Sequence, residues 1–411
     1  MKTHQQSNAA LVLILGALCT VSPFAIDMYL SAFPQIAIAL GTTSARLALT
    51  VSSYFIGLSV GQIAYGPLLD RFGRRRPLIV GLALFVLSSF ACTQVHSIEE
   101  LIILRFLQAV GGCGAQVAAM AMVRDFFPVQ DAAKIFSLLT LILGASPLLA
   151  PTFGAFVAAY LGWRWIFIML GGIVAAILSI VFLYLPEGHQ PDRSVSLRPG
   201  PILSGFSAVF RQPQFQTYAV CGALSFSGLF AYVSGSPTIF LEYFHVSARF
   251  YGGIFAFLSV GFIGGSQLNL LFARRFSSHK VFKTALIFQT VSSLTFLAIS
   301  LTGNLGGGLG DGLNHERGLY TTIFFLFANL ASLGLTNPNA SALALAPFTR
   351  NVGSASALLG FIQIGVGALA SAGVGLFVAG GLIPTVSLLC FGACSALLFL
   401  LFSPASGHPD K

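Results

Sequence analysis

The 411-residue sequence has few charged side chains, which make up 8% of it, whereas hydrophobic residues make up 56%. Soluble domains carry about 25% charged residues, because their surfaces must be covered by groups that water solvates. A chain of this length with so little charge cannot cover a soluble surface. The shortage therefore excludes a soluble protein and indicates an integral membrane protein.

Acidic residues are scarcer than basic ones, 12 against 21, and the net charge is +9. The basic residues lie in short segments between apolar runs rather than on one solvated face, which argues against nucleic-acid binding. Only one acid, Asp27, lies well inside an apolar run, and all seven histidines fall in loops or tails. A membrane-embedded enzyme would need clustered acids or histidines, so we expect no catalytic residues and no enzyme activity.

The six cysteines lack the paired spacing of a zinc site or of a secreted disulfide scaffold. All of them lie within or at the edge of apolar runs, so we expect them to pack as small hydrophobic residues. Cys390 and Cys394 are one helical turn apart, but their neighbourhood offers no further ligands. The sequence therefore predicts no metal and no cofactor.

Twelve apolar runs approach the length that a membrane-spanning helix needs, ~20 residues for ~30 Å of hydrocarbon. Their approximate limits are 11–33, 46–67, 78–95, 99–123, 135–158, 163–185, 215–238, 250–273, 281–303, 318–342, 354–379 and 382–402. The first run lacks a small-residue cleavage site, so we expect an uncleaved signal anchor. The sequence predicts an all-α integral membrane protein with twelve transmembrane helices.

The basic residues alternate between the two ends of successive runs. If the N-terminus is cytoplasmic, sixteen of them fall on the cytoplasmic side and four on the outer side, and Arg105 remains within the fourth run. This bias predicts that both termini are cytoplasmic. We expect a multi-pass protein of the bacterial inner membrane.

A segment rich in proline, glycine and charge, 186–213, lies at the middle of the chain. It predicts a cytoplasmic linker between an N-terminal six-helix half, 1–185, and a C-terminal six-helix half, 214–411. A weak repeat with a shift of 204 residues supports this division, because 61–72 aligns with 265–276. Parallel six-helix repeats are typical of one large class of secondary transporter.

The loop between the second and third runs reads GPLLDRFGRRR over residues 66–76. Gly66 and Gly73 allow close approach and a tight turn, and Asp70 can cap a neighbouring helix N-terminus. The loop resembles the signature G-x-L-x-D-R-x-G-R-[KR] of the major facilitator superfamily. That resemblance implies a conformational latch that holds the outward-facing state, formed by Gly66, Asp70, Arg71, Gly73, Arg74 and Asp125. The alternative, that the arginines at 74–76 serve topology alone, stays open.

Four further segments resemble the drug:proton antiporters of that superfamily, namely 27–30 with Pro34, 105–112, 123–125 and 150–154. Three segments of the second half resemble the bicyclomycin/chloramphenicol resistance (Bcr/CflA) branch, namely 234–237, 337–340 and 353–360. The antiporter motif of the fifth helix usually reads G-P-x-x-G-G, and alanine replaces glycine here at positions 150 and 155. The resemblance implies that the helix bends at Ala150, Pro151 and Gly154.

Asp27 is the candidate proton carrier. A charge at the bilayer centre costs roughly 2.5–3.5 kcal/mol on insertion scales, so such residues face protein or water and have a function. A carboxyl group that binds a proton on one side and releases it on the other can couple proton flow to alternating access. The alternative is an aspartate that hydrogen bonds to neighbouring helices satisfy permanently.

Arg105 lies about a turn and a half into the fourth run and keeps its charge. Its functional role, which the resemblance also implies, is to hold polar groups of the first helix and to tune Asp27 in one state. The alternative is an arginine whose head group reaches the outer interface.

Other polar residues within the runs are candidates for the lining of a central cavity. They are Tyr29, Gln116, Tyr232, Asn337 and Gln363, with Pro23, Asn269, Asn329 and Asn339 as further candidates. Single Asn and Gln residues in membrane helices serve as often in interhelical hydrogen bonds.

Taken together, these features predict a monomeric, proton-coupled multidrug efflux transporter that exports small, largely apolar compounds by alternating access. Its partners would be a drug-like small molecule, protons and the lipid bilayer. A metabolite or amino-acid exporter of the same fold is the alternative. A channel would instead need a ring of polar groups along a pore.

Overall fold

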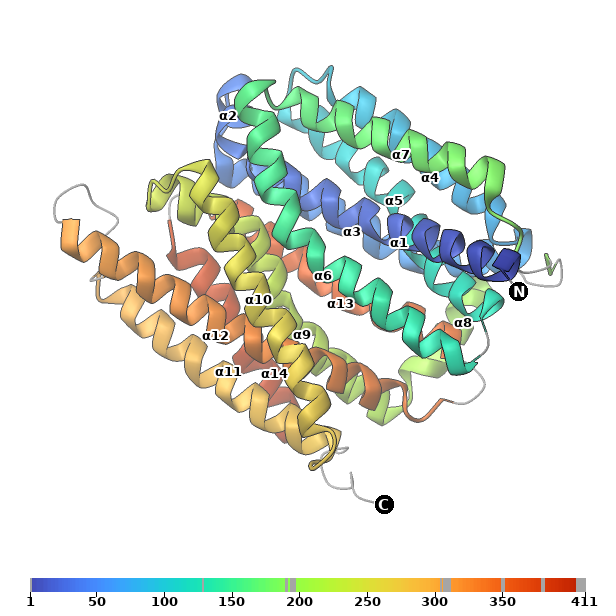
Figure 1. Ribbon diagram of the computed structural model, residues 1–411. Helices are drawn as coiled ribbons and strands as arrows, with labels where there is room; N and C mark the ends of the chain where they lie inside the picture. Colours follow the sequence, from blue (N-terminus) through green and yellow to red (C-terminus); the bar gives the residue numbers. More distant parts are fainter. Residues whose placement is uncertain are drawn as a thin grey trace. The chain divides into compact units, whose positions relative to one another are not determined.

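The computed structural model describes residues 2–127, 129–188, 191–192, 197–303, 305, 312–348, 352–377 and 381–403. All regular secondary structure in these ranges is helical (Figure 1). The chain forms two compact units. Unit 1 consists of Met1–Leu40 and Ser53–Leu203, and unit 2 consists of Gly41–Ser52 and Ser204–Lys411.

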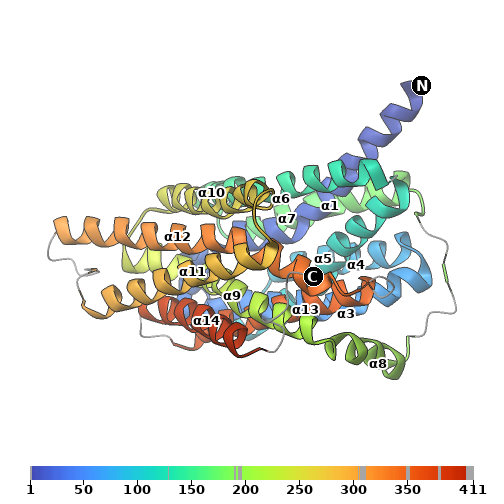
Figure 2. The same cartoon turned by 90° about the horizontal axis from the view of Figure 1, so that it is seen from below.

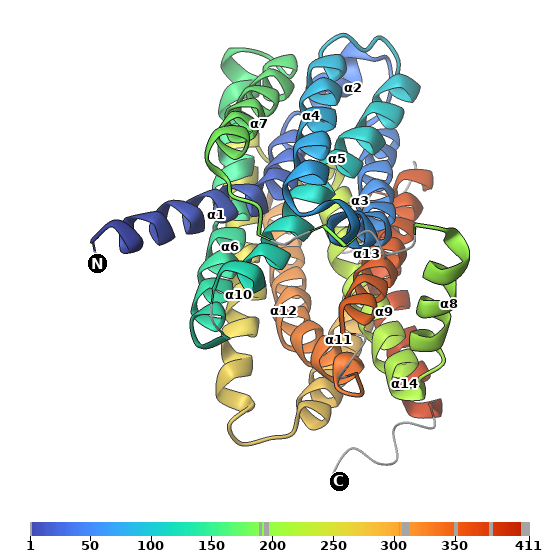
Figure 3. The ribbon, with the colours of Figure 1, turned by 90° about the vertical axis from the view of Figure 1, so that its right-hand side faces the viewer.

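Unit 1 contains six long helices and one short one. They are α1 (Lys2–Leu30), α2 (Phe33–Ala39), most of α3 (Ser44–Phe72), α4 (Arg75–Cys92), α5 (Ile98–Phe126), α6 (Val129–Tyr160) and α7 (Arg164–Tyr184). The first helix, α1, packs against α5, α6 and α7, and α4 packs against α5 and α7 (Figure 3). Residues 27–30 of α1 therefore lie among other helices of the unit rather than on an isolated helix.

Unit 2 contains six long helices and a π-helical turn. They are α9 (Pro213–Pro237), the π-helical turn η1 (Thr238–Tyr243), α10 (Ala248–Phe272), α11 (Ser278–Leu301), α12 (Gly312–Leu345), α13 (Val352–Leu376) and α14 (Ile383–Phe402). Helix α9 packs against α12, α13 and α14, while α12 lies between α10 and α11 (Figure 2). The first turns of α3 belong to this unit, where Ser52 Oγ and Ser371 Oγ are 2.7 Å apart.

The predicted linker is not wholly irregular, because α8 (Pro199–Phe210) lies within it. Proline is tolerated in the first turn of a helix, where the missing N–H has no partner in any case, so Pro199 and Pro201 do not prevent this helix. The nine residues that follow Pro201 contain apolar side chains at helical spacing, including Phe206 and Val209, which are buried. The exact division of the chain at 186–213 stays a prediction.

The predicted runs coincide with long helices. Eleven helices of the described chain are long and apolar enough to cross a membrane. The remaining run, 135–158, lies in the 32-residue α6, whose described apolar part is Leu149–Tyr160.

One predicted boundary is wrong. The run at 11–33 was expected to be continuous, but α1 ends at Leu30, and after a two-residue turn α2 begins with Pro34 in its first turn. Proline cannot donate the hydrogen bond that would continue α1, and it restricts the residue before it. Asp27 consequently lies in the last turn of α1 rather than well inside a longer helix.

Within each unit, a glycine allows two helices to touch, and the two pairs of helices correspond to each other. A Cβ atom added at Gly61 of α3 would lie 2.6 Å from the Cβ of Cys113 on α5. One added at Gly265 of α10 would lie 2.1 Å from the carbonyl oxygen of Ala331 on α12. These two glycines are the first residues of the aligned repeat, so the repeat coincides with equivalent helix contacts in the two units.

Candidate functional site

Asp27 is a buried carboxylate, with 6% of its surface exposed. No hydrogen bond or ion pair joins it to another residue among those that the structure describes. Its place in the last turn of α1 adds to the cost of a negative charge, because helix carbonyl groups point toward that end. The described chain therefore contains no residue that satisfies Asp27 by a permanent hydrogen bond, as the alternative would require.

The backbone of α6 touches α1 beside Asp27. A Cβ atom added at Gly154 would lie 2.3 Å from the carbonyl oxygen of Met28 and 2.7 Å from its Cα, which is closer than such atoms approach. Only glycine allows this contact. The predicted motif residue Gly154 thus places α6 directly against the residue that follows Asp27.

The two alanines that depart from the antiporter motif fit their positions. Ala150 is fully buried and Ala155 is 7% exposed, so both methyl groups are accommodated in the packing. Pro147 and Pro151 lie inside α6 and each removes a helical hydrogen bond. The structure therefore retains the proline and the one glycine that the contact with α1 requires.

Arg105 is fully buried, which contradicts the alternative of an arginine that reaches the interface. Its guanidinium carbon lies 4.6 Å from the ring centroid of Tyr29 and 4.3 Å from that of Tyr54. Its Nη1 donates to Gln108 Oε1 at 2.6 Å, and Gln108 Nε2 donates to Ser89 Oγ at 2.7 Å. These contacts connect α5 to α1, α3 and α4.

Arg105 and Asp27 do not form an ion pair in the described chain. Residues two apart on a helix differ by about 200° in direction, so Asp27 points away from the face on which Tyr29 meets Arg105. Two donors of Arg105, Nε and Nη2, also lack an acceptor among the described residues. In this conformation Arg105 therefore makes no contact with Asp27 through which it could tune that residue, as was predicted for one state.

The predicted latch contains an ion-pair network. Arg74 Nη1 lies 2.7 Å from Asp70 Oδ1, and Arg74 Nε lies 2.8 Å from Asp125 Oδ2. Burial alone would lower the pKa of Arg74, but hydrogen bonds and charge from Asp125 and Asp70 outweigh it and raise the pKa above its ordinary value. The structure thus brings together three of the predicted residues, from the end of α3, the start of α4 and the end of α5.

Gly73 forms the turn between α3 and α4 with φ of +84°, in the left-handed region that favours glycine. A Cβ atom there would also lie 2.9 Å from Glu187 Cδ. The carboxylate of Glu187 accepts hydrogen bonds from the backbone N–H groups of Arg74 and Arg75. Gly73 therefore makes both the turn and the space for this carboxylate.

Glu187 was not predicted, and it makes the contact expected of Asp70. The carboxylate at the N-terminus of α4 belongs to Glu187, whereas Asp70 accepts from the Arg74 side chain four residues along the chain. Local spacing favoured Asp70, and an acid that follows α7 more than 100 residues later gives no local signal. Its position directly after Pro186, at the end of the sixth run, is the only clue in the sequence.

The remaining latch residues lie less closely in this network. A Cβ atom added at Gly66 would meet no described atom within 4 Å, so the predicted close approach there is not observed. The guanidinium carbon of Arg71 lies 5.9 Å from the ring centroid of Phe72.

Two predicted cavity residues meet in unit 2. Gln363 Nε2 of α13 donates to Asn337 Oδ1 of α12 at 3.2 Å, and both side chains are half-buried. Tyr232 is buried with its ring stacked on Phe255 at 5.6 Å between centroids. Tyr29 is enclosed by Phe33, Phe167 and Arg105, so it packs within unit 1.

Gln116 is half-buried. Asn329, a further cavity candidate, instead forms a hydrogen bond between two helices. Ser293 Oγ donates to Asn329 Oδ1 at 2.6 Å, between α11 and α12. In unit 1 Gln108 meets Ser89 in the same way, between α4 and α5. Ser293 follows Ser89 by 204 residues, which is the shift of the aligned repeat. The hydrogen bond with Ser293 shows that Asn329 joins two helices rather than lining a cavity.

The sequence pattern of the Major Facilitator Superfamily matches residues 15–372. The chain belongs to this superfamily. Its members are membrane transporters for small molecules, so this chain is a multi-pass transporter and not an enzyme. The family that the loop at 66–76 predicted is confirmed, and so is the all-α fold.

Similar proteins agree with this assignment. The chain is 29% identical over 403 residues to a protein of Haemophilus influenzae named as a bicyclomycin resistance protein homolog, which covers 97% of this chain and 96% of the relative. It is 28% identical over 351 residues to the multidrug resistance protein MdtL of Klebsiella pneumoniae, covering 85% and 84%. The crystal structure of a D-xylose-proton symporter superposes with a TM-score of 0.74 at 14% identity, covering 97% and 98%. That likeness supports the fold alone.

Proposed function

We propose that this major facilitator exports small, largely apolar, drug-like compounds from the cytoplasm in exchange for protons. The observation that carries the proposal is Asp27, a buried carboxylate with no partner among the described residues, beside the close contact of α1 and α6. The names of the similar resistance proteins support the class of substrate. The protein would act as a monomer in the inner membrane, with both termini in the cytoplasm.

In this mechanism Asp27 is the group that binds and releases the proton. A carboxyl group in this place is disfavoured as an anion while it is enclosed, and it can release its proton when one state admits water. The proton then leaves on one side of the membrane and is replaced from the other. Transport is coupled to this exchange because each state would expose Asp27 to one side of the membrane only.

The halves joined by 186–213 would rock between the two states. The network of Arg74 with Asp70 and Asp125 would hold one of these states, as the resemblance implies. The backbone contact at Gly154 would transmit movement of α6, which its prolines allow to bend, to the helix that carries Asp27. Arg105 would hold the opposite face of that helix through Tyr29.

The replacement Asp27→Asn tests the proposal, because asparagine keeps the shape and cannot carry a proton. We expect the variant to fold, to bind substrate, and to lose proton-driven efflux down to the rate of membranes without the protein. The measurement is drug uptake into inverted vesicles, whose cytoplasmic face is outside, under an imposed pH gradient, with drug susceptibility in a host that lacks other pumps.

Glu316→Gln is the matched control, since it removes an exposed acid at the start of α12. Undiminished resistance of Asp27→Asn at equal expression would refute the coupling role of Asp27. Efflux that survives collapse of the proton gradient would point to a channel. Accumulation of a metabolite or an amino acid, instead of a drug, in a deletion strain would indicate the alternative exporter.

A further inference from the structure

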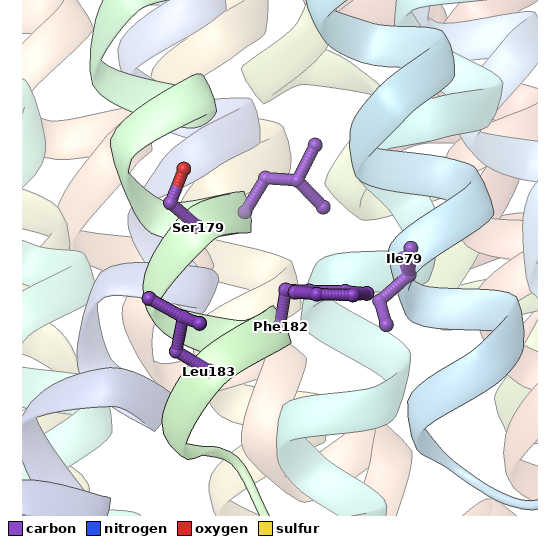
Figure 4. Close-up of a pocket in the computed structure, with 5 residues that line it drawn as sticks. Ile79, Ser179, Phe182 and Leu183 are labelled. Atoms are coloured by element: carbon purple, nitrogen blue, oxygen red, sulfur yellow. The ribbon is translucent and has the colours of Figure 1, made fainter.

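An apolar groove lies between α4 and α7 on unit 1 (Figure 4). Its lining consists of Ile79 from α4 and Leu178, Ser179, Phe182 and Leu183 from α7. Its volume of about 390 Å³ lies within the ~300–1,000 Å³ that small-molecule sites occupy. The groove is therefore large enough to hold part of a small amphipathic molecule.

The groove opens on the exposed face of two membrane-spanning helices, which lipid would contact. Phe182 is 59% exposed and Leu183 is 67% exposed, and both α4 and α7 are apolar spans. The molecules that meet such a surface in a membrane are lipids, whose acyl chains match an apolar lining. The location thus selects a lipid chain as the occupant of the groove.

A guanidinium group lies at one end of the groove. Arg75 is one helical turn from Ile79 on α4, and its guanidinium carbon lies 5.8 Å from the ring centroid of Phe182. Its Nη2 donates to the carbonyl oxygen of Phe182, while its Nε is buried without an acceptor among the described residues. The neighbouring Arg76 is exposed.

Among the described residues, no carboxylate forms an ion pair with the side chain of Arg75 or Arg76. The carboxylate of Glu187 lies nearby but bonds the backbone N–H of Arg75. An apolar groove with cations at its end matches a lipid whose chain is apolar and whose head group is an anion. Arginine also has planar donors suited to phosphate oxygens.

We propose that the α4–α7 groove binds one anionic phospholipid, with an acyl chain along Ile79, Leu178 and Phe182 and its phosphate at Arg75 and Arg76. This site is separate from Asp27 and from the ion pairs of Arg74. It does not depend on which compound the protein transports.

The test uses the purified full-length protein and two lipids, phosphatidylglycerol and zwitterionic phosphatidylcholine. Bound lipid is counted by native mass spectrometry and the affinity by titration in detergent. We expect phosphatidylglycerol to be preferred, and Arg75→Ala to weaken its binding about fivefold, since one arginine near an anionic lipid contributes ~1 kcal/mol. Arg275→Ala is the matched control, because it removes the same charge from the exposed loop after α10.

A second variant tests the apolar part independently. Ser179→Trp should fill the groove and weaken phosphatidylglycerol binding, whereas Ile180→Trp places the same ring on an exposed neighbour outside the lining. Thermal unfolding confirms that each variant is folded. Equal weakening by Arg75→Ala and Arg275→Ala would overturn the proposal in favour of general charge attraction. Unchanged binding by Ser179→Trp would also overturn it.

Discussion

At the scale of single residues, Arg105 is a cation enclosed by protein without a carboxylate beside it among the described residues. Enclosure of a charge costs several kcal/mol and must be offset by specific contacts. Two aromatic rings each contribute ~0.5–2 kcal/mol, and a hydrogen bond to a charged group contributes about 1.5–3 kcal/mol. Tyr29, Tyr54 and Gln108 supply these contacts.

The replacement Arg105→Lys should therefore not be tolerated. Lysine is a point charge without the planar fork that lies between two rings and reaches Gln108, so the enclosed charge would lose contacts. We expect a loss of stability of about 2 kcal/mol or more, judged from those contacts, and slower transport. The measurements are thermal unfolding in detergent and efflux in vesicles.

The control for that change is Arg249→Lys, at an exposed arginine in the first turn of α10. It should leave both stability and transport unchanged. Wild-type behaviour of Arg105→Lys would mean that Arg105 contributes charge alone and that its ring contacts are incidental.

At the scale of elements, the contact between α1 and α6 depends on one missing side chain. The carbonyl oxygen of Met28 occupies the space where a Cβ of residue 154 would lie. Because the backbone fixes the position of the Cβ and the oxygen is itself a backbone atom, the clash cannot be relieved by a rotamer change. The helices would have to separate at the turn that contains Asp27.

Gly154→Ala should consequently destabilise the protein by about 1–3 kcal/mol, the range for overpacked interiors. It should also reduce proton-driven efflux more than substrate binding, because α1 would be displaced at Asp27. Gly172→Ala is the matched control, since nothing lies within 4 Å of a Cβ at that position of α7. That control should be neutral or more stable, as alanine favours helix over glycine by ~1 kcal/mol.

These two variants are compared by thermal unfolding, by substrate binding and by efflux. Equal behaviour of Gly154→Ala and Gly172→Ala would show that the contact with Met28 is not required for transport.

At the scale of the whole molecule, Glu187 joins the end of α7 to the turn between α3 and α4. Glu187 is also the second residue of the segment 186–213 that the sequence predicts to connect the two halves, so we expect a change in that segment to affect the latch. Arg74 keeps its charge, as arginine does, and its two carboxylate partners raise its pKa further.

Glu187→Ala removes the carboxylate from the N-terminus of α4. We expect a loss of about 0.5–1 kcal/mol, the lower part of the capping range, because Glu187 is exposed to solvent and its charge is screened. Transport should fall more than the amount of membrane protein, as it should for Asp70→Ala.

Glu242→Ala, at an exposed acid of the π-helical turn η1, is the control for overall charge. Thermal unfolding and efflux at matched expression are the measurements. A fall in protein amount equal to the fall in transport would mean that Glu187 is structural only.

The sequence determined the class of the protein, the number of apolar runs, the superfamily and the two exceptional charges, Asp27 and Arg105. The class, the runs and the two charges follow from composition and local pattern, because a lipid environment penalises each polar residue separately and makes exceptions visible in a single sequence. The superfamily followed from the resemblance of the loop at 66–76 to its signature. The turn at Gly73 was also predictable, because the need for glycine at a tight turn is local.

Only the tertiary structure decided which groups meet. The resemblance had placed Arg74 and Asp125 in one latch, but these residues are 51 apart and Arg75 and Glu187 are 112 apart, so spacing along the chain contains no information about which atoms pair. The direction of each side chain on its helix decided that Arg105 meets Tyr29 and Tyr54 rather than Asp27. The break after Leu30 decided how close Asp27 lies to a helix end. These outcomes depend on how helices turn and pack against one another, which the local pattern of residues does not specify.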